Sequence, residues 1–137
     1  MSESRTEYKE AKDIMTEAEV KGTIIEAAQA RGWMAYSIPD SRHVNPRKRH
    51  PKDELSGNGF PDLVLLKLPY LVFVEAKNER GVVSPDQGRW LESLRKVGDE
   101  YRMAYVFACV VRPGRIDDFL DWLDTIDRLE ILRQRYP

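Results

Sequence analysis

Two carboxylates and one lysine, Asp62, Glu75 and Lys77, have the residue types and spacing that could do chemistry. Asp62 directly precedes one apolar run that favours a β-strand, and Glu75 and Lys77 end the next such run. Because side chains alternate along a strand, Glu75 and Lys77 point to the same face. If the two runs form a hairpin, Asp62 comes opposite Glu75 or Ala76. Both carboxylates and the ammonium then converge at one end of the hairpin.

Convergent carboxylates repel one another unless a cation lies between them. Their hard oxygen atoms suit a hard divalent cation such as Mg²⁺ or Mn²⁺. Magnesium keeps several of its waters, so a neighbouring lysine can orient or deprotonate one as a nucleophile while the metal stabilises charge developing on a phosphate. The pattern therefore predicts phosphodiester hydrolysis. The alternative is structural: Asp62 begins a strand, and Glu75 and Lys77 form an exposed ion pair.

Apolar periodicity and capping residues predict the elements that must position these side chains. They are a helix over Thr16–Arg31, a strand over Trp33–Ile38, a hairpin of Leu63–Leu66 with Leu71–Val74, a helix over Ser84–Val97, a strand over Tyr101–Val111 and a helix over Ile116–Tyr136. We expect Gly32 and Gly98 to end the first two helices. The strand that ends at Val111 is apolar on both faces and should be central, and the last helix leaves room for one break.

The order α-β-β-β-α-β-α predicts an α/β fold, a mixed central sheet flanked by helices. A length of 137 residues fits one domain over residues 1–137, and the order of the polar segment 1–13 is left open. The sequence has no apolar run of the roughly 18 residues that a membrane span needs. Its single cysteine, Cys109, lies in an apolar run where a small buried side chain is expected.

In these residues the sequence resembles the PD-(D/E)xK nuclease superfamily, and its VRR-NUC branch in particular. The superfamily signature is a Pro-Asp followed by an acid-x-Lys. The residues that carry the resemblance are Gly59-Phe60-Pro61-Asp62, Glu75-Ala76-Lys77 and the trailing Gly81, Ser84, Gln87, Trp90 and Gly98. The resemblance runs from about the first helix to Val111 and implies a restriction-endonuclease-like fold. It further implies a nuclease of the kind found in phage and bacterial proteins and in DNA repair.

By this resemblance Asp62 and Glu75 would bind the metal, the carbonyl of Ala76 would add a ligand, and Lys77 would activate water. Gln87 would support the site by pointing toward the water or phosphate. Its side chain could equally reach back to the backbone amide of Ser84 as part of a capping box. Both readings of Gln87 stay open.

The family usually supplies a further acid from its first helix. Glu17, Glu19 and Glu26 compete for that role. At about 100° per residue, Glu17 lies on the apolar face of the helix, whereas Glu19 and Glu26 point nearly opposite. We therefore expect Glu17 to join the metal ligands, the alternative being a glutamate placed in the first turn by the helix dipole.

A basic loop over residues 39–59 directly precedes the expected site. Its cations suit phosphate contacts that position DNA without reading its bases, although a solvated charged loop is the alternative. Gly57 and Gly59 would let a nucleic-acid backbone approach closely or simply make the turn. The candidate DNA-binding residues are Arg42, Arg47, Lys48, Arg49 and Lys52, joined by His43 and His50.

Taken together, these features predict a Mg²⁺- or Mn²⁺-dependent DNA endonuclease, with structured or branched DNA among its substrates. The alternative is a DNA-binding or assembly module that keeps the fold without turnover. A net charge of −1 indicates that DNA contact is confined to a local patch. The absence of an apolar N-terminal segment predicts a cytoplasmic protein, and the resemblance implies that the cell is a bacterium or a phage-infected host. Apolar residues of the last helix would serve either the core or a homodimer: Phe119, Leu120, Trp122, Leu123 and Ile126.

Overall fold

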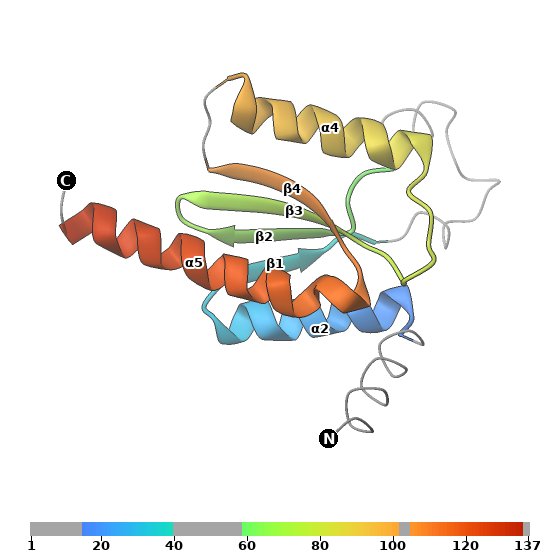
Figure 1. The fold of residues 1–137 in the computed structure, drawn as a ribbon, viewed down its shortest axis with the longest axis horizontal. Helices are drawn as coiled ribbons and strands as arrows, with labels where there is room; N and C mark the ends of the chain where they lie inside the picture. The colour runs from blue at the N-terminus through green and yellow to red at the C-terminus, as the bar shows by residue number, and fades with distance from the viewer. Residues whose placement is uncertain (1–14, 40–58, 102–104, 136–137) are drawn as a thin grey trace.

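The computed structural model describes residues 15–39, 59–101 and 105–135 (Figure 1). The predicted α/β order α-β-β-β-α-β-α is confirmed, with one short 3-10 helix added before the last α-helix. The elements are α2 (Glu17–Ala30), β1 (Met34–Ser37), β2 (Leu63–Lys67), β3 (Tyr70–Ala76), α4 (Pro85–Asp99), β4 (Val106–Val111), η3 (Pro113–Arg115) and α5 (Ile116–Arg135). Segment 1–13 and nearly all of the basic loop, including its candidate DNA-binding residues, lie outside the described residues.

The four strands form one mixed sheet in the order β1-β2-β3-β4. β1, β2 and β3 are antiparallel neighbours, and β4 runs parallel to β3. The hairpin between β2 and β3 pairs Leu63 with Val74 and Lys67 with Tyr70, as its predicted register requires. The expectation that β4 is central is wrong, because β4 is the outermost strand of the sheet that the structure describes. Helices on both faces, rather than strands on both sides, explain its apolar sequence.

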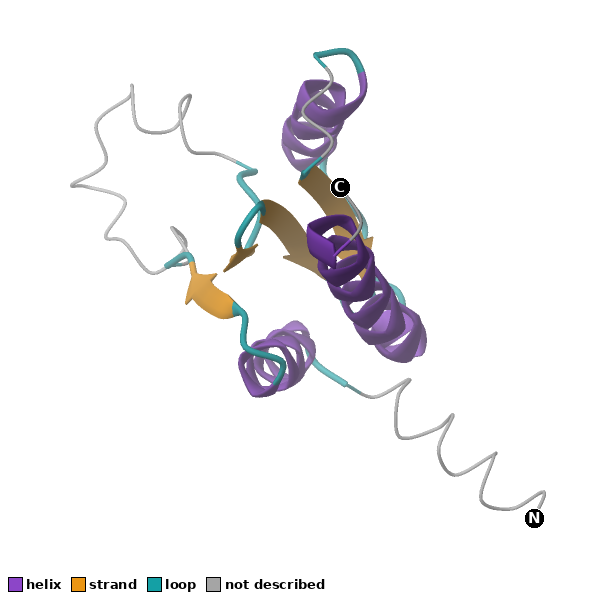
Figure 2. Ribbon diagram, turned by 90° about the vertical axis from the view of Figure 1, so that its left-hand side faces the viewer, coloured by secondary structure: helices purple, strands orange, loops and turns teal. Residues whose placement is uncertain are grey.

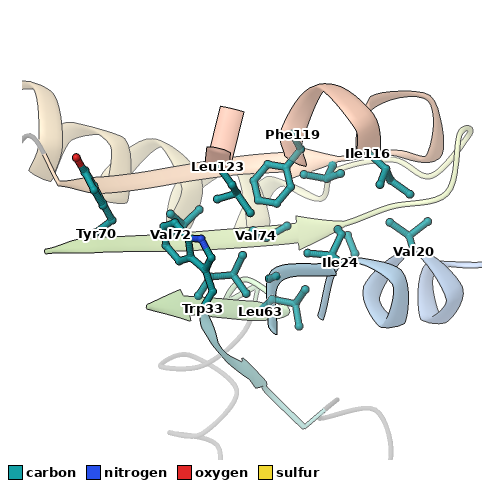
Figure 3. Close-up of a cluster of buried hydrophobic side chains, with 14 of the residues drawn as sticks. Val20, Ile24, Trp33, Leu63, Tyr70, Val72, Val74, Ile116, Phe119 and Leu123 are labelled. Carbon is teal, nitrogen blue, oxygen red and sulfur yellow. The ribbon is translucent and has the colours of Figure 1, made fainter. Parts of the chain in front are cut away.

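Helices α2 and α5 cover one face of the sheet, and α4 covers the other (Figures 1 and 2). The hydrophobic core lies between the sheet and the first pair of helices (Figure 3). Apolar residues of α5 supply much of it: Phe119, Leu123 and Ile126 are buried, and Leu120 and Trp122 pack against them. The structure therefore uses the apolar residues of this helix in the core. A homodimer through this helix stays a prediction.

The ends of the helices follow from local chemistry. Thr16 caps α2 by accepting a hydrogen bond from the amide of Glu19, and Gly32 after the helix has a φ of 83° that suits glycine. At α4 the expected end is wrong, because Gly98 lies inside the helix and Glu100 is the C-cap. A glycine lowers helix propensity by about 1 kcal/mol without forcing a helix to stop. The last helix continues to Arg135 without a break.

Two further features of the fold bear on function. Burial raises the pKa of the Cys109 thiol to about 12, so this cysteine is a packing residue rather than a nucleophile. In the part of the chain that the structure describes, no helix is both long and apolar enough to cross a membrane.

Candidate active site

The β2–β3 hairpin places Asp62 beside the end of β3. Continuing its register by one residue sets Asp62 opposite Glu75, and Asp62 Oδ2 accepts a hydrogen bond of 3.1 Å from the amide of Ala76. The carboxylate thus takes the place that a backbone carbonyl of β2 would occupy in a continued ladder. One oxygen of Asp62 is held by the backbone, so the direction of the other is fixed.

Pro61 leaves the carbonyl of Ala76 without a ladder hydrogen bond from the neighbouring strand. The amide of Ala76 points toward β2, since it donates to Asp62, and the carbonyl of the same residue points to the same side. The continued register brings Pro61 opposite Ala76. Because proline has no N–H, it cannot donate the ladder hydrogen bond to that carbonyl. The Pro-Asp pair therefore leaves a backbone oxygen at the same edge as the two carboxylates.

Glu75 and Lys77 are the buried charged residues of the described chain, 2% and 6% exposed. This burial contradicts the alternative of an exposed ion pair. Lys77 Nζ lies 3.6 Å from Glu75 Oε1 and 3.8 Å from Glu17 Oε1. Glu17 therefore reaches the site from the first turn of α2, whereas Glu19 and Glu26 are exposed. The angular spacing of residues around the helix had predicted the same division, with Glu17 on the side of the site and the other two acids on the opposite side.

The charge of Glu75 is poorly compensated. Its Oε2 atom is buried and has no hydrogen-bond partner among the residues that the structure describes. Burial, and next to it the negative charge of Asp62, raises the pKa of Glu75 from 4.5 to about 8, although the Lys77 ammonium opposes the shift. A carboxyl group in this state gains most from a cation that replaces its proton.

Gln87 completes the capping box of α4 and also contacts the site through Glu75, while its contact with water or phosphate stays a prediction. Its Oε1 accepts a hydrogen bond of 2.9 Å from the amide of Ser84, and the Ser84 hydroxyl accepts from the amide of Gln87, which completes the capping box of α4. The Nε2 atom of the same side chain donates to Glu75 Oε1 at 2.8 Å. One residue thus starts the helix and orients the buried carboxylate, so Glu75 Oε2 is the oxygen left unpaired.

These two roles of Gln87 can be separated by mutation. We expect Ser84→Ala to cost about 1 kcal/mol of unfolding free energy through the lost cap, with little effect on cleavage. Gln87→Leu should cost about 2–3 kcal/mol, because it also leaves the buried Glu75 Oε1 without its donor, and should slow cleavage at least about tenfold. Urea unfolding and single-turnover cleavage measure the two effects. Equal cleavage rates in the two variants would contradict a role of Gln87 in the site.

The start of α4 is packed tightly against the segment that leads into Asp62. Gly59 has a φ of 83°, and a methyl group on it would lie 2.5 Å from the backbone carbon of Asp86. Phe60 next to it meets Trp90 edge-on at 4.9 Å between ring centroids. Gly59 therefore makes the turn and lets the helix approach, and Trp90 packs in the layer under α4.

A contact that the sequence did not reveal holds the turn after Lys77, which we call the 78–81 turn (Asn78–Gly81). Arg112 Nη1 donates to the carbonyls of Asn78 at 2.8 Å, Glu79 at 3.4 Å and Gly81 at 2.6 Å. A methyl group on Gly81 would lie 3.3 Å from Glu17 Oε1, so the turn packs directly on the site. Arg112 is more than thirty residues from this turn, and no local spacing pattern could indicate it.

The described residues fit a divalent cation of the magnesium type. No three Asp, Glu, His or Cys side chains among them gather into a complete metal-binding group. Glu75 Oε2, the second oxygen of Asp62 and the Ala76 carbonyl nevertheless form a set of hard oxygen donors. Magnesium is commonly bound through one or two carboxylates while it keeps several waters. The set described here provides two carboxylates.

These donors are separate from the cavity that lies along β4. A cavity of about 550 Å³ runs along β4 between α4 and α5, bordered by Phe119, Trp122 and Arg95, and contains none of the predicted site residues. An apolar cleft of this kind does not suit a charged reaction centre. The carboxylate site instead lies at the end of the β2–β3 hairpin opposite its turn, which suits a polymeric substrate.

Comparison with known proteins agrees with this geometry. The VRR-NUC domain family matches residues 29–108, a range that holds Asp62, Glu75, Lys77 and Gln87 and covers more than half of the chain. The chain belongs to the VRR-NUC domain family, whose fold is restriction-endonuclease-like, and membership indicates a nuclease-type function on DNA. No curated protein and no solved structure matches the chain.

Proposed function

We propose that the chain is a Mg²⁺- or Mn²⁺-dependent endonuclease that hydrolyses phosphodiester bonds of DNA. The observation that carries the proposal is the buried Glu75 Oε2, which has no described hydrogen-bond partner and lies on a residue beside both Asp62 and Lys77. A buried carboxylate without a partner costs stability, and a fold retains it where a cation is bound. Asp62, Glu75 and the Ala76 carbonyl would hold that cation, with Glu17 as a further ligand.

When bound, the metal would supply electrostatic stabilisation of the charge that develops on the scissile phosphate. Gln87 orients Glu75 by donating a hydrogen bond from its Nε2 atom to Glu75 Oε1. Lys77 is held between Glu75 and Glu17, and we assign it the activation of the attacking water. Glu17 in turn fixes the position of the Lys77 ammonium. The water oxygen attacks phosphorus as the P–O bond to the leaving oxygen breaks; the water gives up one proton to solvent, and the leaving oxygen takes one from solvent and ends as a hydroxyl group.

The competing proposal is a DNA-binding or assembly module that has this fold but does not cleave. Asp62, Glu75 and Lys77 form one cluster around a poorly compensated charge, and this favours the enzyme. A module without turnover needs no buried carboxylate of raised pKa.

The deciding experiment is metal-dependent cleavage by the purified protein. We expect supercoiled plasmid, single-stranded DNA or branched junctions to be cut with Mg²⁺ or Mn²⁺ and to remain intact with a chelator. Asp62→Asn should reduce the rate by roughly two orders of magnitude or more, because it removes a charged ligand. The choice among the three DNA forms identifies the substrate class. DNA binding without cleavage under every divalent cation would support the non-catalytic module instead.

A further inference from the structure

Almost every lysine and arginine whose side chain the structure describes has a carboxylate or carbonyl partner. Arg31, Lys67, Arg89, Lys96 and Arg115 form ion pairs with single acids, Arg95 and Arg112 donate to backbone carbonyls, and Lys77 lies between two glutamates. Within the described residues three cations have neither kind of partner: Lys21, Arg80 and Arg128. An unpaired cation keeps its full charge for a ligand.

Two of these three cations flank Glu17. Lys21 is one helical turn beyond Glu17 on α2, which places both on the same side of the helix. A glutamate and a lysine at this spacing commonly pair, but here the Glu17 carboxylate turns toward Lys77, and Lys21 stays unpaired. Arg80 precedes Gly81, whose backbone packs against the Glu17 side chain. The two free cations thus lie on two different elements that meet at Glu17.

The backbone that carries Arg80 is fixed. Arg112 donates to three carbonyls of the 78–81 turn, and Glu79 accepts a hydrogen bond from the amide of Gly114. The side chain of Arg80 is nevertheless exposed. A surface arginine on a constrained turn beside a reaction centre loses little backbone entropy on binding, so it is suited to contact a charged ligand.

We propose that Lys21 and Arg80 bind two phosphates of one DNA strand on either side of the Glu17 carboxylate. This proposal rests on the proposed nuclease function and names the residues that align its substrate. The contacts go to the sugar-phosphate backbone and therefore carry no base specificity. They also explain how acids can approach a polyanion, since the two cations offset repulsion between the carboxylates and the strand.

Salt dependence of binding provides a test that does not depend on cleavage. Affinity for a short labelled DNA duplex is measured by fluorescence anisotropy in chelator over a series of salt concentrations. The slope of log affinity against log salt is negative. Lys21→Gln and Arg80→Gln should each make it less steep by about 0.9, and the double variant by about 1.8. With metal present, both should raise the half-saturating DNA concentration more than they lower the rate at saturation.

Arg128→Gln is the matched control. It removes the same charge and also has no described partner, but it lies on α5 next to Asp127, which pairs with Lys67 at the hairpin turn. It should leave the slope unchanged. The proposal is overturned if the salt slope is the same in the wild type and in all variants, or if Arg128→Gln reduces the slope as much as Lys21→Gln and Arg80→Gln do. It is also overturned if the wild type does not bind DNA. If the slopes change as expected but no metal supports cleavage, the phosphate contacts stand and the nuclease function fails.

Discussion

Replacement of Lys77 by alanine should lower the rate of DNA cleavage by roughly 10²- to 10⁴-fold, the range for loss of a group that activates the attacking water. The ammonium lies within 4 Å of two carboxylates, and the residue Lys77 is 6% exposed, so a cation from solvent has little access to this position. Single-turnover cleavage of plasmid in Mg²⁺ measures the loss. DNA affinity in chelator should change little, because the proposed strand contacts are made by other cations.

Lys67→Ala is the control for this prediction. Lys67 belongs to the same hairpin and also bonds an acid, Asp127 at 2.7 Å, but it lies at the turn, away from the site. Its loss should cost at most about 1 kcal/mol and leave cleavage unchanged. Because Lys77→Ala also removes the packing of the buried aliphatic stem, Lys77→Met, which keeps that stem and removes only the charge, serves as a second variant. Wild-type rates in a folded Lys77 variant would remove this residue from the mechanism.

The metal-free protein should become less stable as the pH rises, through the ionisation of Glu75. Its pKa in the folded protein, about 8, is above the ordinary 4.5, so the folded state binds the proton more tightly than the unfolded state does. The stabilising contribution is complete below pH 4.5 and is lost between about 5 and 8. At about 1.4 kcal/mol per pH unit, the upper limit of this loss is roughly 5 kcal/mol.

Glu75→Gln isolates this contribution. The neutral amide cannot ionise, so the variant should be more stable than the wild type at pH 9 in chelator and nearly equal to it at pH 4.5, while its cleavage is abolished. Added Mg²⁺ at pH 9 should raise the melting temperature of the wild type but not of the variant. Urea unfolding across the pH range provides the free energies. Glu92→Gln, at an exposed position of α4, should show no such difference. Parallel pH profiles for the wild type and Glu75→Gln would disprove the assignment.

Much of the site could be predicted because it depends on local geometry. Strand alternation placed Glu75 and Lys77 on one face, and the short hairpin fixed Asp62 opposite Glu75. Helical periodicity separated Glu17 from the other acids of α2. Each of these rules acts over a few residues and needs no knowledge of the rest of the fold.

Other features depend on packing between distant segments, which spacing does not encode. The position of β4 at the edge of the sheet was mispredicted because helices on both faces of a strand favour an apolar sequence even where no strand pairs on one side. Gly98 did not end α4, since packing of the helix on the sheet outweighs a weak propensity. Arg112 had no signal of its own, because its partners are backbone carbonyls, which every residue has.

The shared use of one side chain at the start of α4 limits which residue types position 87 accepts. The position needs an acceptor for the Ser84 amide and, on the same planar group, a donor for Glu75. Glutamate has the length but no donor, asparagine has both groups but is one methylene shorter, and lysine has no acceptor. Of these four side chains, glutamine alone meets both demands. A library of all substitutions at position 87, selected for DNA cleavage, should therefore return to the parental residue.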